Sequence, residues 1–247
     1  NMRTFAKKEG DHYVINGTKN WVTNGISSNI VLVMCLTEKG IGHNGISTFI
    51  IEKEFEGFSV GKKEDKLGIR GSDTCELYFE NCKVPINNRL GGEGGGFKIA
   101  LGTLDGGRIG IATQALGIAK ESLDRSVLYA NEREQFGKKI GNFGAIQSKI
   151  AKMATNVEAA RLLIYKAAKM KDLGLPFRKE AAMAKSFASK VAMDSSIECV
   201  QIFGGYGYVK ETGVERLMRD AKITQIYEGT SEIQEMVIAR EVLGGNI

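Results

Sequence analysis

The residue types best suited to chemistry lie in one short segment near the end of the chain, residues 226–232. Glu228 stands there between a tyrosine and a glycine, and Thr230 and Ser231 follow as residues that can cap the start of a helix. Glu232 would then lie in the first helical turn, where an acidic side chain is stabilising. Glu228 is therefore either a structural acid at a helix entry or a desolvated general base.

A second candidate is the pair Asp105 and Arg108, three residues apart and so on one face of a helix. The pair is either an ordinary exposed ion pair or a polar pair that recognises an anionic or amide-bearing ligand. The surrounding helix is rich in glycine, which weakens helices but lets a backbone or ligand come close. These glycines are Gly102, Gly106, Gly107, Gly110 and Gly117.

Other site types find little support in the sequence. The glycine-rich segment 91–96 matches no phosphate-loop pattern and is interpreted as a flexible interdomain connection. Four cysteines without CxxC spacing and two histidines predict no metal site, no disulfide framework and a reducing setting, cytoplasmic or mitochondrial matrix. A net charge of +5 without a basic run predicts no nucleic acid partner, and no apolar run is long enough for a membrane span.

The first part of the chain has the pattern of an all-β unit, a small sandwich or barrel. Asn16-Gly17 gives a strong hairpin signal and Asn24-Gly25 a second turn signal. The predicted strands cover residues 12–15, 19–23, 30–36, 45–52, 58–62 and 74–79.

From about Gly96 onward, apolar residues recur at helical spacing. The predicted helices cover 96–132, 146–174, 176–197 and 231–243. Long helices with short connections favour an antiparallel bundle. The predicted fold class is therefore α+β, with a sandwich-like or barrel-like β domain over 1–88 and a four-helix bundle over 89–247.

Five motifs in this order resemble the acyl-CoA dehydrogenase family, and its short-chain, butyryl-CoA branch in particular. They are Asn16–Gly25 (NGTKNWVTNG), Lys62–Gly71 (KKEDKLGIRG), Asp105–Ala112 (DGGRIGIA), Gln201–Tyr208 (QIFGGYGY) and Ile226–Gln234 (IYEGTSEIQ). The resemblance implies that FAD and a short-chain acyl-CoA are bound, and that the thioester is oxidised to the trans-2-enoyl-CoA. Glu228 would remove the α-proton while flavin N5 accepts the β-hydride.

The resemblance also implies a set of binding residues. Those implied for FAD are Trp21, Val22, Thr23, Arg133, Phe136, Gln201, Gly204, Gly205, Thr230, Ser231 and Glu232. Those implied for the substrate are Asp105, Arg108 and Gly229. Some relatives carry the base at the position of Gly107, where a glycine here leaves Glu228 as the base.

Family chains begin with a helical domain for which this sequence has no counterpart. A chain without that domain is expected to fold but to bind FAD weakly, and the alternative function is an inactive remnant that serves as an assembly or binding module. The expected partners are an electron-transfer flavoprotein as electron acceptor and further copies of the chain, in a homodimer or homotetramer.

Overall fold

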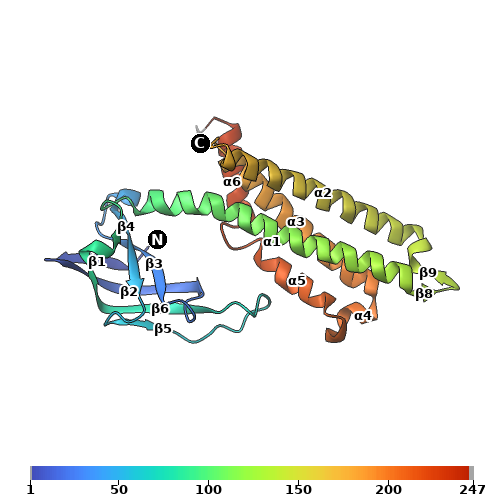
Figure 1. Cartoon of the computed structure of the whole chain (residues 1–247), viewed down its shortest axis with the longest axis horizontal. Coiled ribbons are helices and arrows are strands. Elements are labelled where there is room, and N and C mark those ends of the chain that lie inside the picture. Colours follow the sequence, from blue (N-terminus) through green and yellow to red (C-terminus); the bar gives the residue numbers. More distant parts are fainter. Residues whose placement is uncertain (1, 245–247) are drawn as a thin grey trace. The chain divides into compact units, whose positions relative to one another are not determined.

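The computed structural model of the protein describes residues 2–244. The chain forms two compact units, one up to Thr103 and one from Leu104 (Figure 1). The first unit contains the large sheet and the second the helical domain, which confirms the predicted α+β fold class. The units divide inside helix α1, Gly96–Glu132, whereas the sequence placed the boundary at residue 88.

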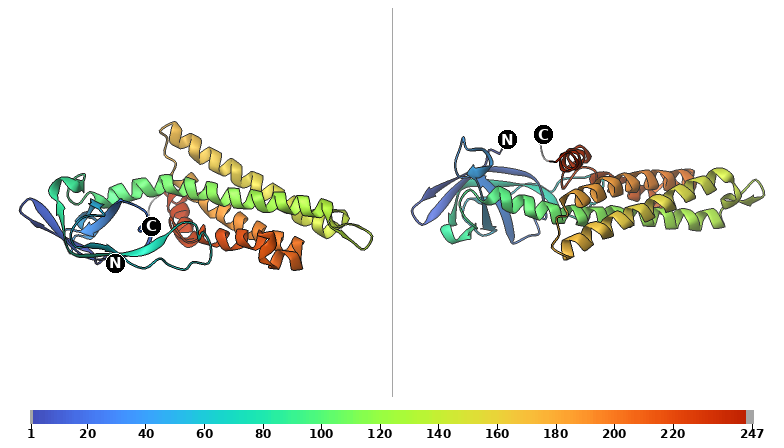
Figure 2. Two further views of the ribbon diagram at one scale, coloured as in Figure 1. Left: turned by 60° about the horizontal axis from the view of Figure 1, so that its bottom comes forward. Right: turned by 90° about the horizontal axis from the view of Figure 1, so that it is seen from above.

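Seven strands of the first unit form one sheet in the order β5-β6-β2-β1-β3-β4-β7. Figure 2 shows the strands of this unit, coloured blue to green, from two further sides. Neighbouring strands are antiparallel except β1 and β3, which are parallel. The strands are β1 Phe5–Glu9, β2 His12–Thr23, β3 Ile30–Leu36, β4 Ile46–Glu52, β5 Phe58–Val60, β6 Thr74–Pro85 and β7 Arg89–Leu90.

Large side chains from strands that are not neighbours fill the core of this sheet. The rings of Tyr13 in β2 and Phe49 in β4 make an edge-to-face contact, with centroids 4.8 Å apart. Two strands lie between β2 and β4 in the sheet order, so the sheet must curl to bring these rings together. The curl encloses an apolar core that also includes Ile15, Leu77 and Phe79.

The hairpin predicted at Asn16-Gly17 is wrong. Strand β2 runs on from His12 to Thr23, and its pairing with β6 shifts register between Ile15 and Gly17. Asn16 Oδ1 accepts a hydrogen bond of 2.8 Å from the backbone N–H of Asn81, a residue of β6 with φ 53°. The two residues therefore make a β-bulge, and the chain reverses earlier, at Gly10 and Asp11.

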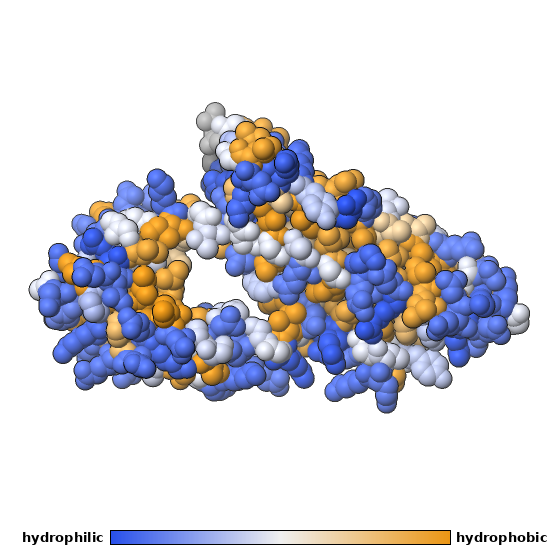
Figure 3. All heavy atoms as spheres, viewed as in Figure 1, coloured by the Kyte–Doolittle hydropathy of each residue, from blue (hydrophilic) through white to orange (hydrophobic). Residues whose placement is uncertain are grey.

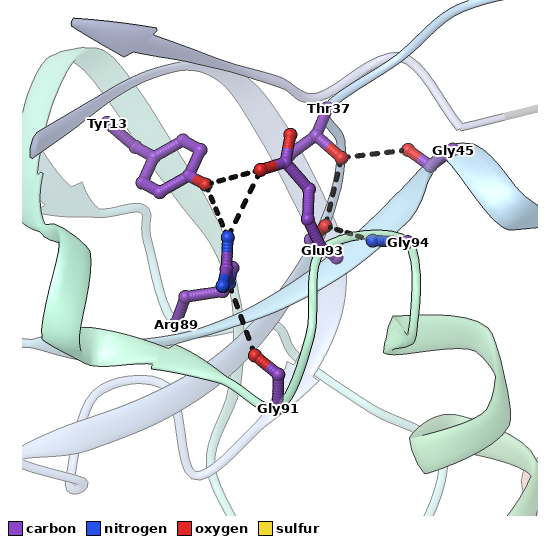
Figure 4. Close-up of polar contacts among 8 residues, drawn as sticks. Tyr13, Thr37, Gly45, Arg89, Gly91, Glu93 and Gly94 are labelled. Atoms are coloured by element: carbon purple, nitrogen blue, oxygen red, sulfur yellow. Dashed lines mark hydrogen bonds and ion pairs between the residues drawn. The ribbon is translucent and has the colours of Figure 1, made fainter. Parts of the chain in front are cut away.

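The glycine-rich segment 91–96 is anchored to the sheet rather than free (Figure 4). Glu93 Oε2 accepts hydrogen bonds from the Tyr13 hydroxyl at 2.9 Å and from Arg89 Nη1 at 3.1 Å. The backbone N–H of Gly94 donates to Ser47 Oγ at 3.0 Å. These contacts differ from the flexible connection that the glycines predict, and they fix where α1 begins.

Among the described residues, the second unit consists mainly of helices. Besides α1 it contains α2 Gly144–Asp172, α3 Arg178–Phe203, α4 Gly205–Tyr208, α5 Val214–Ile223 and α6 Ser231–Val242, with a small hairpin of β8 Glu134–Gln135 and β9 Lys138–Lys139. Its core is made mostly of alanines, among them Ala115 of α1, Ala160 of α2 and Ala188 of α3. Small side chains at these positions let helix backbones pack closely.

The predicted bounds of α1 are confirmed, whereas α2 and α3 begin and end at other residues than predicted, and neither α4 nor α5 was predicted. Helix α3 begins at Arg178, two residues after Pro176. Helix α5 was not predicted at all; it has ten residues and buries only Val214 and Ala221, so its apolar pattern is short.

Candidate active site

Glu228 lies in the loop between α5 and α6 and has a backbone φ of 54°, in the left-handed region. For a residue with a side chain this conformation costs about 1–2 kcal/mol, so other contacts must hold it. Gly229 follows with φ 89°. Thr230 then caps α6, because its Oγ1 accepts from the backbone N–H of Ile233 at 3.4 Å. The capping role expected of Thr230 is confirmed.

The carboxylate of Glu228 lies against α1 at Gly107. A methyl group added to Gly107 would stand 2.7 Å from Glu228 Oε2, closer than non-bonded atoms approach. The glycine therefore makes the space that the carboxylate occupies. Of the other glycines of α1, Gly106 approaches only Lys171 Nζ, at 3.2 Å from an added methyl group.

Two buried side chains bind the backbone of the Glu228 loop. Lys185, in the middle of α3, donates from Nζ to the carbonyl of Gly229 at 2.6 Å. Gln234, in α6, donates from Nε2 to the carbonyl oxygens of Glu228 and Gly229 at 3.1 and 3.0 Å. Both side chains are 0% exposed. Hydrogen bonds of this kind contribute about 1 kcal/mol each, and more for a charged donor, which offsets the strained backbone.

Burial, together with the nearby Arg108 charge, lowers the pKa of Lys185 from 10.5 to about 8. The carboxylates of Glu228 and Glu232 act in the opposite direction. Glu232 is exposed in the first turn of α6, and hydrogen bonds from its own backbone N–H and from the Thr230 hydroxyl lower its pKa. The loop thus lies among charges of both signs.

Asp105 and Arg108 form an ion pair of 2.8 Å within α1. Arg108 is only 4% exposed and the Asp105 side chain 23% exposed, so the pair is half-buried rather than the ordinary exposed pair that the spacing allows. Among the described residues, Arg108 Nε is a buried donor without a partner. Tyr227, the neighbour of Glu228, donates its hydroxyl hydrogen to Gln114 Oε1 of α1.

A second cluster of expected residues lies at the other end of the helical unit. Arg133, Gly204 and Gly205 line one pocket of about 510 Å³, together with Tyr129 and Tyr206. The guanidinium of Arg133 lies 5.5 Å from the ring centre of Tyr206. An added methyl group on Gly204 or Gly205 would meet nothing within 4 Å, so the pocket is open beside the backbone.

Two residues expected beside this pocket do not line it. Phe136 is 92% exposed at the tip of the β8–β9 hairpin, with φ 52° and its ring edge-on to Phe143. Gln201 is exposed near the end of α3, where its carbonyl accepts from the backbone N–H of Gly204 at 3.2 Å. Both lie close to the pocket in sequence but not among its lining residues.

Trp21, Val22 and Thr23 end strand β2 in the first unit. The pairing of β2 with β6 shifts register between Lys19 and Val22, and Trp21 takes a φ of 59°. As a result the indole is 72% exposed. Asp73 fixes the turn that follows by accepting from Ile26 N–H at 2.8 Å and from the Ser27 hydroxyl at 2.7 Å. An exposed aromatic on a fixed turn is suited to contact a planar ligand.

Lys185 and Gln234 could not be recognised as site residues from the sequence. Nothing in the spacing of α3 separates Lys185 from the exposed Lys190, and a glutamine in the first turn of α6 resembles any polar helix residue. Only their burial beside the Glu228 loop distinguishes them.

The geometry defines a helical unit that presents one carboxylate from a strained loop and, elsewhere, an open arginine-lined pocket. Two domain families match this chain: residues 1–82 match the acyl-CoA dehydrogenase middle domain, and residues 94–243 the acyl-CoA dehydrogenase C-terminal domain. The chain belongs to the acyl-CoA dehydrogenase family, as its motifs predicted.

Individual relatives agree with this assignment. The chain is 53% identical over 241 residues to the short-chain specific acyl-CoA dehydrogenase of Clostridium acetobutylicum, covering 98% of this chain and 64% of that protein. Butyryl-CoA dehydrogenase from Megasphaera elsdenii superimposes with a TM-score of 0.96 at 53% identity, covering 98% of this chain and 63% of that one.

A chain in a structure described as the electron transferring flavoprotein of Acidaminococcus fermentans has a TM-score of 0.97 at 53% identity, with coverage of 98% and 64%. The chain therefore spans about 64% of the length of the relatives it matches.

Within the described range, no three histidine, cysteine or acidic side chains are grouped so that they could hold a metal ion. All four cysteines are buried and unpaired. No helix between residues 2 and 244 is long and apolar enough to cross a membrane.

Proposed function

We propose that the protein oxidises a short-chain acyl-CoA thioester to the trans-2-enoyl-CoA, with Glu228 as the base that removes the α-proton. The observation that carries the proposal is the placement of the Glu228 carboxylate. It comes from a strained loop held by buried donors and lies in a space that only glycine at position 107 leaves open. Such strain is characteristic of functional sites.

A thioester α-proton is weakly acidic, so abstraction needs a fixed base and a donor for the developing enolate oxygen. Glu228 supplies the base. Its backbone N–H finds no acceptor among the described hydrogen bonds and is therefore available to the thioester carbonyl. The space beside Gly229 is occupied by the Gln234 amide, so this glycine contributes through its backbone φ of 89°. The Asp105–Arg108 pair, in which Arg108 is buried with an unpartnered Nε, is suited to hold the polar part of the acyl-CoA.

The residues of this chain fit FAD. The open pocket at Arg133, Gly204 and Gly205 offers a guanidinium fork and unhindered backbone, which suit a pyrophosphate. Gln201 and Phe136 are exposed and lie near the pocket residues in the sequence. Thr230, Ser231 and Glu232 follow Glu228, and Trp21 presents an exposed aromatic side chain before Val22 and Thr23. When bound, FAD supplies the hydride acceptor that the protein lacks.

The partners follow from the same assignment. We infer an electron-transfer flavoprotein as the acceptor of the electrons, in line with the Acidaminococcus fermentans structure that this chain resembles. We also infer a homodimer or homotetramer in the cytoplasm or the mitochondrial matrix. Apolar side chains are exposed along the helical unit (Figure 3), among them Leu128, Leu162 and Tyr165, each between 57% and 59% exposed.

An anaerobic titration of the FAD-loaded chain with butyryl-CoA tests the proposal. Loss of the oxidised flavin absorbance in the wild type, and its persistence in Glu228→Gln, are expected. Flavin that binds but is not bleached in the wild type would contradict the proposed activity and favour a binding module. A Glu228→Gln chain that bleaches as fast as the wild type would remove Glu228 from the role of base.

A further inference from the structure

The lysine beneath the Glu228 loop is unusual for its position. Lys185 is 0% exposed in a part of the molecule where α3 packs mainly through alanines, such as Ala184 and Ala188. A buried ammonium loses its hydration and is rarely retained without a partner. Its one hydrogen bond among the described residues goes to the carbonyl of Gly229, at 2.6 Å.

Other lysines of the same helix behave differently. The Lys190 side chain is 70% exposed and pairs with Asp194 one turn away, at 2.6 Å. An apolar side chain of similar length at position 185 would fill the same space without the cost of burying a charge. The amine is therefore explained by what it binds, which is the backbone next to Glu228.

Gln234 completes the arrangement from a different helix. Its Nε2 donates to the carbonyls of Glu228 and Gly229, so that two buried side chains bind two consecutive carbonyls. A methyl group added to Gly229 would lie 2.5 Å from that nitrogen, which shows how closely the amide is packed against the loop. The peptide planes on both sides of Gly229 are thereby fixed.

We propose that Lys185 is a positioning residue for the reaction: through the Gly229 carbonyl, and with Gln234 as a second donor, it holds the Glu228 carboxylate beside Gly107. The inference rests on the proposed function, but the loop geometry that it explains does not. Lys185 need not touch the substrate to act. Its loss releases the loop, and a base displaced by about 1 Å loses on the order of 100-fold in rate.

The test compares Lys185→Met with Lys190→Met, which removes an exposed lysine from the same helix. The first readout is hydrogen exchange at the backbone amide of Ser231, which donates to the carbonyl of Gln225 at 3.0 Å and closes the loop. We expect this amide to exchange at least about 10-fold faster in Lys185→Met and unchanged in Lys190→Met, while amides in the middle of α3 stay protected.

The second readout is steady-state turnover of butyryl-CoA by the FAD-loaded chain. In Lys185→Met we expect kcat to fall about 10- to 100-fold with KM changed less than about 3-fold, since positioning acts on the chemical step. Lys190→Met is expected to turn over like the wild type. Because a buried substitution can prevent folding, Gln234→Met, which removes the second donor, is measured in the same way and is expected to show both effects.

The outcomes separate the two proposals. Ser231 exchange that is unchanged in folded Lys185→Met and Gln234→Met overturns the positioning role, whatever the activity. Faster exchange with an unchanged kcat also overturns it. Faster exchange in a protein whose wild type does not react with butyryl-CoA supports the loop contact and contradicts the proposed function.

Discussion

The two units of the molecule fill their interiors with different side chains. The β unit packs large groups, such as Tyr13, Phe49 and Phe79. A hydrogen bond from the Tyr13 hydroxyl to Glu93 anchors the segment 91–96 to its sheet. The helical unit packs alanines and buries charged and amide groups, Arg108, Lys185 and Gln234. Lys185 and Gln234 both bind the backbone of the Glu228 loop, so this unit gives up some stability to hold that loop in place.

The largest effect that we expect is a loss of stability on substitution in the core of the β unit. Phe49→Ala is expected to lower the free energy of unfolding by about 3–5 kcal/mol, because Phe49 is 0% exposed and packs edge-to-face on Tyr13. Denaturant unfolding measures the loss. Leu32→Ala, at a residue 58% exposed in β3, is the control and is expected to cost about 1 kcal/mol or less. Equal losses in the two variants would contradict the assignment of this core.

The next effect lies in the helical unit and concerns rate rather than stability. Gly107→Ala places a methyl group 2.7 Å from Glu228 Oε2 and must displace the carboxylate. We expect turnover of butyryl-CoA by the FAD-loaded chain to fall on the order of 100-fold. If Gly107→Ala keeps the wild-type rate, the carboxylate is not confined by α1 and the described geometry is not the reacting one.

A smaller effect is the pH dependence of stability that Lys185 introduces. Because its pKa falls from 10.5 to about 8 on folding, the unfolded chain binds more protons between these values. The free energy of unfolding of the wild type should therefore rise relative to Lys185→Met as the pH increases from about 8 to about 10, by about 1–3 kcal/mol.

Denaturant unfolding of both chains across this pH range measures the difference. The neighbouring charges of Arg108, Glu228 and Glu232 are present in both chains and largely cancel in the comparison. A relative stability that falls with pH would mean that the lysine gains a stronger acidic partner on folding than the structure shows.

The smallest effect distinguishes the glycines of α1 from one another. A methyl group added to Gly110 meets nothing within 4 Å, so Gly110→Ala should stabilise the helix by about 1 kcal/mol. Thermal unfolding measures this gain. Destabilisation by Gly110→Ala would show that this glycine, like Gly107, borders an occupied space.

Local sequence patterns predicted the long helix α1 well, but they predicted neither the β-bulge in β2 nor the short helix α5. Helix α1 has the predicted bounds, because its apolar spacing extends over ten turns without a proline. The Asn16-Gly17 signal failed because the pairing partner, β6, lies some sixty residues further along the chain and turns the expected hairpin into a bulge. The ten residues of α5 carry too few apolar positions to be recognised alone.

In the candidate site, too, local sequence could predict some features and not others. The position of Glu228 before a capped helix was predictable from its neighbours, and the resemblance to a family supplied its role. Its confinement by Gly107 and its support by Lys185 join residues more than 40 positions apart. A buried lysine has the same sequence signature as an exposed one, so only the fold reveals it.

Exchange of the α-protons of butyryl-CoA with deuterium oxide in the FAD-loaded chain shows directly whether Glu228 is the base. The matched control is Glu235→Gln, which neutralises an exposed carboxylate of α6. We expect exchange by the wild type and by Glu235→Gln, and a loss of about 100-fold or more in Glu228→Gln. Wild-type exchange in Glu228→Gln would contradict the assignment of Glu228 as the base.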